Sequence, residues 1–124
     1  MCMRYIICSV KMDLKMTKRP GQAVRGSTSG RPIMVLLDIL GKRWTLRILW
    51  ELNQSKSATF RDLRSRCEEV SPTLLNSRLK DLRALNLVSL ESDGYALTKE
   101  GKSLSQKLAP LDAWASEWAK SLDT

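Results

Sequence analysis

The sequence predicts a mainly helical fold with one small β-hairpin. Four segments with helical spacing of apolar residues or clear helix-start signals come first, and two short strand-like runs around Asp93-Gly94 follow them. A further long helical stretch comes last. Three consecutive helices followed by a two-stranded hairpin form the arrangement of a winged helix-turn-helix domain, which the remaining helices extend at both ends.

Length and composition favour one globular domain with a long leader. The chain has 124 residues, of which 43% are hydrophobic, and this is enough to bury a core. Residues 1–30 are expected to be a flexible basic N-terminal tail, because "TKRPGQAVRGSTSGRP" shows no helical or strand period. A basic arm that touches phosphates is the alternative interpretation. Residues 31–124 are expected to form the domain.

The first two helices are predicted from their apolar patterns. Residues 32–40, "PIMVLLDIL", are apolar nearly all round and begin with a proline, which suits the first turn of a helix. Gly41 should end this helix. A second helix is expected over "KRWTLRILWELN", where Trp44, Ile48 and Leu52 recur on one face.

The third and fourth helices are predicted from their caps. Thr59 should cap a short helix, "FRDLRSRC", in which Cys67 is a core side chain and not a reactive thiol. Ser71 as N-cap and Pro72 at the first helical position mark the start of the fourth helix. Asn86 tolerates a left-handed backbone, so the helix should end at about residue 85 or 86.

The hairpin and the last helix complete the domain. Residues 87–91 and 95–98 are expected to be strands joined at Asp93-Gly94, a strong tight-turn signal. The last helix should begin near Lys99, and Pro110 inside it should kink or break it. Its apolar stripe consists of Leu104, Leu108, Leu111, Trp114, Trp118 and Leu122.

The fourth helix has two distinct faces on a wheel of about 100° per residue. One face is made of leucines and should contact the core. The other face is short and polar, and a major groove about 12 Å wide admits such a helix where bulky side chains would hold it off. Asn pairs with adenine, Lys donates to guanine, and Ser or Thr serves a base or a phosphate. The candidate base-reading residues are Thr73, Asn76, Ser77 and Lys80.

The start of this helix has two interpretations. Its free amides and dipole favour a phosphate, which makes Ser71 and Pro72 candidate DNA contacts. Ser71 can equally serve as a cap alone, and for this residue the capping role is preferred.

Charge is unevenly spread along the chain, whose formal net charge is +8. Residues 1–32 carry seven basic residues and one acid, residues 42–83 carry ten and five, and residues 84–124 carry four and six. Basic residues near the fourth helix can hold phosphates in a helix-turn-helix arrangement. The candidates are Arg61, Arg64 and Arg66 on the third helix, and Lys42 and Arg43 at the start of the second.

Several classes of function are disfavoured by what the sequence lacks. Histidine is absent, which removes the commonest general base and metal ligand, so we expect no enzyme, no metal and no cofactor. Cys2, Cys8 and Cys67 show no CxxC spacing and indicate a reducing cytoplasm. No run approaches the roughly 18 apolar residues of a membrane span, and "YIICSV" is short for a signal-peptide core, so no membrane partner is expected.

Four blocks of sequence resemble, in order, the HxlR family of bacterial winged-helix transcriptional regulators, relatives of the MarR group. The blocks are "LLDILGKRWTLRILWEL", "TFRDLRSRCEEVSPTLLNSRLKDLRALNLV", "YALTKEGKSL" and "APLDAWASEW", and the similarity spans about residues 31–118.

The resemblance implies a dimeric, sequence-specific DNA-binding regulator whose fourth helix reads double-stranded DNA. The first and last helices would form the homodimer interface. Independently of the resemblance, the cavity for any small-molecule effector is expected between helices, lined by apolar residues. The candidate interface residues are Ile33, Leu36, Leu37, Leu108, Leu111, Trp114 and Trp118.

Two departures from the family pattern bear on function. Many members carry Cys-Pro before the first helix, and in some that cysteine senses oxidants, whereas this chain has Arg31-Pro32. The wing is acidic at its tip, with Glu91 and Asp93, and should contribute little to base reading. The acidic wing favours the alternative hypothesis, a winged-helix module that binds protein and not DNA.

Overall fold

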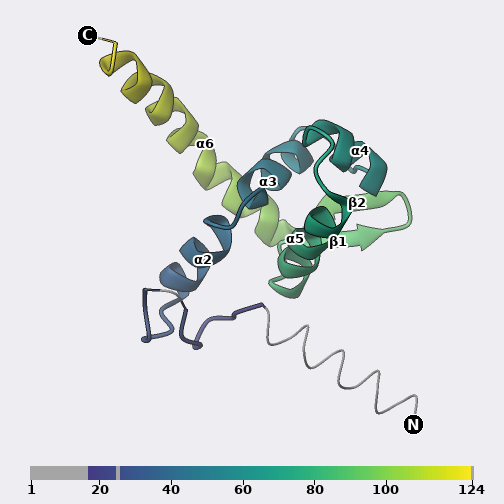
Figure 1. Ribbon diagram of the computed structural model, residues 1–124, viewed down its shortest axis with the longest axis horizontal. Helices are drawn as coiled ribbons and strands as arrows, with labels where there is room; N and C mark the ends of the chain where they lie inside the picture. Colours follow the sequence, from purple (N-terminus) through teal and green to yellow (C-terminus); the bar gives the residue numbers. More distant parts are fainter. Residues whose placement is uncertain (1–16, 25, 124) are drawn as a thin grey trace.

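The computed structural model describes residues 17–24 and 26–123 of the chain, and it confirms a mainly helical winged helix-turn-helix fold (Figure 1). The order of elements is the predicted one. In chain order they are α2 (Pro32–Leu40), α3 (Thr45–Asn53), α4 (Phe60–Arg66), α5 (Pro72–Ala84), β1 (Val88–Glu91), β2 (Gly94–Leu97) and α6 (Lys99–Ser121).

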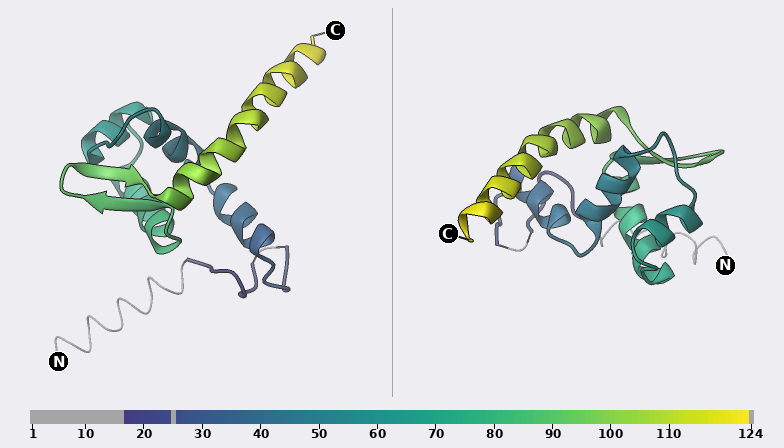
Figure 2. Two further views of the ribbon diagram at one scale, coloured as in Figure 1. Left: turned by 180° about the vertical axis from the view of Figure 1, so that it is seen from behind. Right: turned by 90° about the horizontal axis from the view of Figure 1, so that it is seen from above.

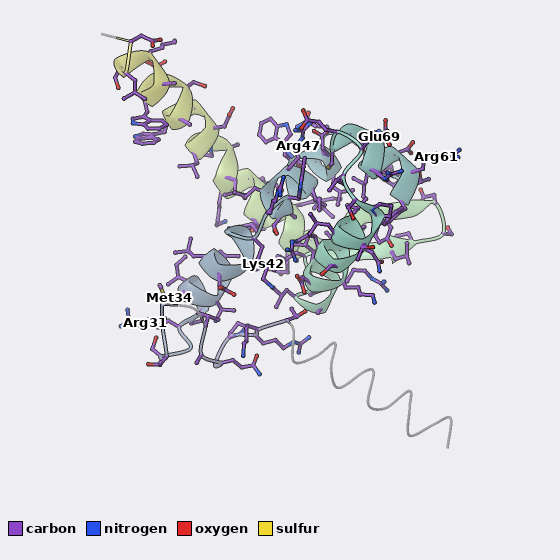
Figure 3. All side chains as sticks on the ribbon, in the orientation of Figure 1. Arg31, Met34, Lys42, Arg47, Arg61 and Glu69 are labelled. Atoms are coloured by element: carbon purple, nitrogen blue, oxygen red, sulfur yellow. The ribbon has the colours of Figure 1, made fainter. Side chains whose placement is uncertain are left out.

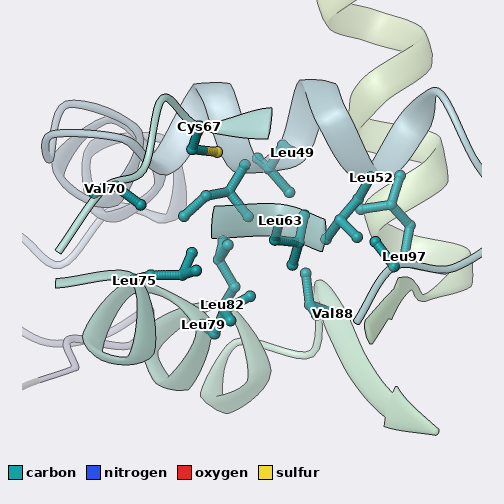
Figure 4. Packing of buried hydrophobic residues seen from close by; sticks show 12 residues of the cluster. Leu49, Leu52, Leu63, Cys67, Val70, Leu75, Leu79, Leu82, Val88 and Leu97 are labelled. Atoms are coloured by element: carbon teal, nitrogen blue, oxygen red, sulfur yellow. The ribbon is translucent and has the colours of Figure 1, made fainter. Parts of the chain in front are cut away.

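One hydrophobic core joins α3, α4, α5 and the hairpin (Figure 4). Fully burying a leucine or isoleucine side chain contributes roughly 1.5–3 kcal/mol, so this cluster dominates the stability of the domain. Leu75, Leu79 and Leu82, the apolar face of the fourth helix, are at most 1% exposed. The buried cluster comprises Ile48, Leu49, Leu52, Ala58, Leu63, Cys67, Val70, Leu75, Leu79, Leu82, Val88 and Leu97.

Both predicted N-caps are present. The Thr59 hydroxyl accepts a hydrogen bond from the Asp62 amide at 3.1 Å, and the Thr59 amide donates to the Asp62 carboxylate at 3.3 Å, which forms a reciprocal capping box. Ser71 accepts from the Leu74 amide at 3.4 Å and precedes Pro72. Asn86 has the left-handed φ of 59° expected of a residue that follows a helix.

The second helix begins three residues later than predicted. Trp44 has a left-handed φ of 76° and precedes α3, which starts at Thr45. Lys42 and Arg43 therefore lie in the α2–α3 turn and not on the helix. Apolar spacing cannot reveal this boundary, because Trp44 packs against the core although it precedes the helix.

The hairpin also differs from the predicted one, because its second strand begins at Gly94 and not at Tyr95. Glu91 pairs with Gly94, so the connecting residues are Ser92 and Asp93, and Gly94 belongs to β2. The Gly94 φ is 131°, and a Cβ there would lie 2.6 Å from the carbonyl oxygen of Ala58. Ala58 and Tyr95 exchange backbone hydrogen bonds of 2.9 and 2.7 Å, which adds a short third segment to the hairpin. This contact from a distant segment explains why the turn signal alone misplaced the glycine.

The last helix passes through Pro110 without a break. α6 is continuous over all its residues and curves along its length (Figure 2). Its first half packs against α3 and β2, whereas its second half extends away from the core (Figure 1). Within the described residues, no helix combines the length and apolar character needed to cross a membrane.

Candidate DNA-binding interface

α5 presents a polar face to solvent on the side opposite its buried leucines. Thr73, Asn76 and Lys80 are exposed, and Ser77 is half-buried. All are short apart from Lys80, so the backbone of α5 can approach a surface closely. This face can donate and accept hydrogen bonds, as the reading of base edges requires.

Of the three arginines of α4, Arg64 holds the helix-turn-helix turn. Arg64 donates from Nε to the carbonyl of Val70 at 2.9 Å and lies 3.5 Å from the Glu69 carboxylate. Arg66 donates to the Ser55 hydroxyl at 3.0 Å. Arg61 is exposed at the other end of the helix. The three predicted phosphate contacts thus differ in their bonding, since two of them brace the domain.

The α2–α3 turn lies beside α5. Lys42 Nζ is 3.5 Å from Asp81 Oδ2, and the Arg43 carbonyl accepts a hydrogen bond of 2.9 Å from Arg78 Nε. Arg43 itself is exposed. The later start of α3 allows this placement, because Lys42 and Arg43 sit on a turn that can reach α5. In the view of Figure 3, α5 lies between Lys42 and Arg61.

Asp81 and Arg78 were missed by sequence reasoning. Asp81 is 5% exposed, and its Oδ2 atom meets both Lys42 and Arg78, at 3.5 and 3.4 Å. A buried carboxylate is costly unless it is paired, and these two cations compensate it. The spacing of Arg78 and Asp81 on the margin of the leucine face was the available signal. No sequence pattern indicated that Lys42 of the α2–α3 turn would pair with Asp81.

A second network ties α3 to α4. Arg47 donates from Nε to Glu51 at 3.0 Å and from its terminal nitrogen to the carbonyl of Arg66 at 2.7 Å. The hydrogen bond to Glu51 raises the pKa of Arg47. Nearby, Cys67 is fully buried, and this burial raises the pKa of its thiol. Cys67 is therefore a core side chain that stays protonated near neutral pH.

The predicted interface residues lie on α2 and on α6 between Leu108 and Trp118. Ile33, Leu37, Leu111, Trp114 and Trp118 are between 51% and 60% exposed. Leu36 and Leu108 are half-buried. The rings of Trp114 and Trp118 stack on each other with centroids 5.9 Å apart.

Three helices packed against a hairpin, with a polar exposed face on the third, define a winged helix-turn-helix protein. The chain belongs to the HxlR-like helix-turn-helix family, whose model matches residues 39–123. Members named in the comparisons are helix-turn-helix transcriptional regulators, a class that acts through DNA binding.

Individual relatives agree with this assignment. The HTH-type transcriptional regulator YvaP of Bacillus subtilis is 32% identical over 89 residues, covering 66% of this chain and 82% of YvaP. A possible HxlR family transcriptional factor from Thermoplasma volcanium superposes with a TM-score of 0.61 at 36% identity, covering 68% of this chain and 82% of that one. Quinone-bound YodB from B. subtilis has a TM-score of 0.64 at 27% identity, covering 68% and 96% of the two chains.

Proposed function

We propose that this protein regulates transcription as a homodimer in which each α5 enters the major groove of one half-site. The exposed face of α5 carries this proposal. Thr73, Asn76 and Lys80 are accessible, and the buried leucines behind them fix the helix on a rigid core. Asn76 is the best candidate for base reading, because its amide can pair with both N6 and N7 of adenine.

Surrounding cations would hold the phosphates. Arg61 lies on α4, and Lys42 and Arg43 lie on the α2–α3 turn. Arg64 and Arg66 retain partial exposure and can add to this field while they brace the domain. Contacts of this kind fix position and orientation, whereas α5 supplies the sequence preference.

Dimerisation is supported by the apolar surface of α2 and α6. Trp114 and Trp118 are 60% and 51% exposed on a part of α6 that extends beyond the core. Large apolar patches on soluble proteins mark interaction sites. A second copy would cover this stripe and place two α5 helices about one helical turn of DNA apart, which is about 10 base pairs.

Replacing Trp118 with Glu should shift sedimentation from dimer to monomer, whereas Gln106→Glu on the same helix should not.

Selection of duplexes from a random pool tests the proposed function. We expect enrichment of a two-fold-symmetric motif with half-sites about one turn apart. Failure to enrich any motif, together with no salt-dependent duplex binding, would reject DNA reading and favour the protein-binding module.

A pocket between α3 and α6 supports the expected small-molecule effector. Its volume is about 300 Å³, and Leu46, Leu49, Trp50 and Leu108 supply apolar lining. This size and lining suit a small apolar molecule. Because one structural relative is quinone-bound, 1,4-naphthoquinone is a reasonable probe. Saturable quenching of tryptophan fluorescence that disappears in Trp50→Phe would support this site, and quenching unchanged in Trp50→Phe would reject it.

A further inference from the structure

The segment before α2 is bonded to α5 at two points. The Thr17 hydroxyl donates to Asp81 Oδ1 at 2.7 Å, and Thr17 is only 5% exposed. Arg19 donates to the carbonyl of Ala84 at 2.6 Å. Asp81 and Ala84 are one helical turn apart, so residues 17–19 run alongside the C-terminal part of α5. These residues were assigned to the tail from sequence.

Each bond satisfies a group that α5 leaves without a partner. The two cations on Asp81 both approach Oδ2, and the Thr17 hydroxyl meets Oδ1. Ala84 is the last residue of α5, so its carbonyl has no intrahelical donor. A guanidinium there also meets the negative end of the helix dipole. Residues 17–19 therefore supply hydrogen-bond donors to two acceptors of α5, the Asp81 carboxylate and the Ala84 carbonyl.

Because Thr17 and Arg19 both bond to α5, the basic side chains of Lys18 and Arg19 are held beside this helix. Lys18 and Arg19 are exposed, and an arginine has five N–H donors, of which the Ala84 bond uses one. Thr17 and Lys42 both contact Asp81, so residues 17–19 reach the flank of α5 that also holds Lys42. In the view of Figure 3, Arg61 of α4 lies on the other side of α5 from Lys42. Cations then stand on both sides of the polar face of α5.

We propose that residues 17–19 form an arm, anchored on α5 by Thr17 and Arg19, whose Lys18 and Arg19 bind the DNA phosphate backbone beside the groove that α5 enters. This rests on the proposed function. Phosphate is the expected partner because both groups are cations at the rim of a surface proposed to face a duplex. Such contacts add affinity without sequence preference.

The salt dependence of binding to a random-sequence duplex tests the arm. Log K falls with log salt with a slope of about −0.9 for each phosphate contact, so Lys18→Gln with Arg19→Gln should reduce the magnitude of this slope by about 1.8 per bound subunit. The matched control is Lys102→Gln with Lys107→Gln, which removes the same charge from α6. The control should keep the wild-type slope. Equal slopes for the arm variant and this control would overturn the proposal.

The anchor is tested separately through Thr17. Thr17→Val keeps the shape but loses the donor, so it should reduce the magnitude of the salt slope, as the double variant does, whereas Thr17→Ser should keep the wild-type slope. A wild-type slope in Thr17→Val would reject the anchoring. If the wild-type protein itself shows no salt-dependent binding, the proposed function fails, and this outcome is distinct from failure of the arm alone.

Discussion

Arg64 of α4 donates from Nε to the carbonyl of Val70, 2.9 Å away, and so fastens α4 to the turn that leads into α5. The turn needs this support, because Glu68 and Glu69 both have a left-handed φ of 57°. Consecutive non-glycine residues in this region are strained, and strain persists only where the surroundings hold it. Arg64 therefore sets the position of α5 as well as being a candidate phosphate contact.

Arg64→Ala should lower both stability and DNA binding. Loss of the bond to the Val70 carbonyl should reduce the free energy of unfolding by about 1–2 kcal/mol. Urea unfolding and duplex binding would measure the two effects. Arg61→Ala is the matched control, because Arg61 is exposed on the same helix. This variant should reduce the magnitude of the salt slope and leave the free energy of unfolding unchanged. Equal stability of the two variants would contradict the bracing role of Arg64.

Asn76→Ala should weaken binding selectively. Loss of a bidentate adenine contact costs about 1–3 kcal/mol on the selected site and almost nothing on a random duplex. Stability should hold, since Asn76 is exposed in mid-helix and alanine is a better helix former. Competition binding with both duplexes measures the difference. An equal loss on the two duplexes would remove Asn76 from base reading.

Gly101→Ala should destabilise the domain, against the usual gain from alanine in a helix. Gly101 is buried in the first turn of α6, and a Cβ there would overlap the carbonyl oxygen of Leu87. Backbone must move to relieve this contact, so we expect a loss of roughly 1–3 kcal/mol in thermal or urea unfolding. Lys102→Ala, at the exposed neighbouring position, should change stability little. A Gly101→Ala variant as stable as Lys102→Ala would show that α6 does not approach the Leu87 carbonyl so closely.

Cys67 should resist alkylation until the protein unfolds. Burial raises the pKa of its thiol, so the folded state holds the proton more tightly than the unfolded state. The resulting stabilisation is complete below the usual thiol pKa of about 8.5 and is lost as pH rises through the folded value. Iodoacetamide labelling from pH 7.5 to 9.5, quantified at Cys67 by peptide mass spectrometry, would measure this protection against a urea-unfolded control. Equal labelling rates in the two states would contradict it.

Sequence reasoning succeeded where the structure is set by neighbours along the chain. Thr59 and Ser71 cap the two helices that their side chains predicted, and Asn86 takes the left-handed backbone expected of it. The division of α5 into leucine and polar faces also held, because helical periodicity is a local property. Errors arose at Trp44 and Gly94, where backbone conformation depends on segments that pack nearby.

By itself, the sequence determined the helices, the hairpin, the core face of α5 and the family, because caps, periodicity and turn residues act over a few positions. Only the tertiary structure decided what surrounds Asp81, whose bonds to Thr17 and Lys42 span 64 and 39 positions. It likewise decided that Gly101 must lack a side chain beside Leu87. The partners of a buried charge, and the backbone that comes close to a glycine, are groups far away along the chain that the fold brings together. The spacing of residues in the sequence does not encode which groups these are.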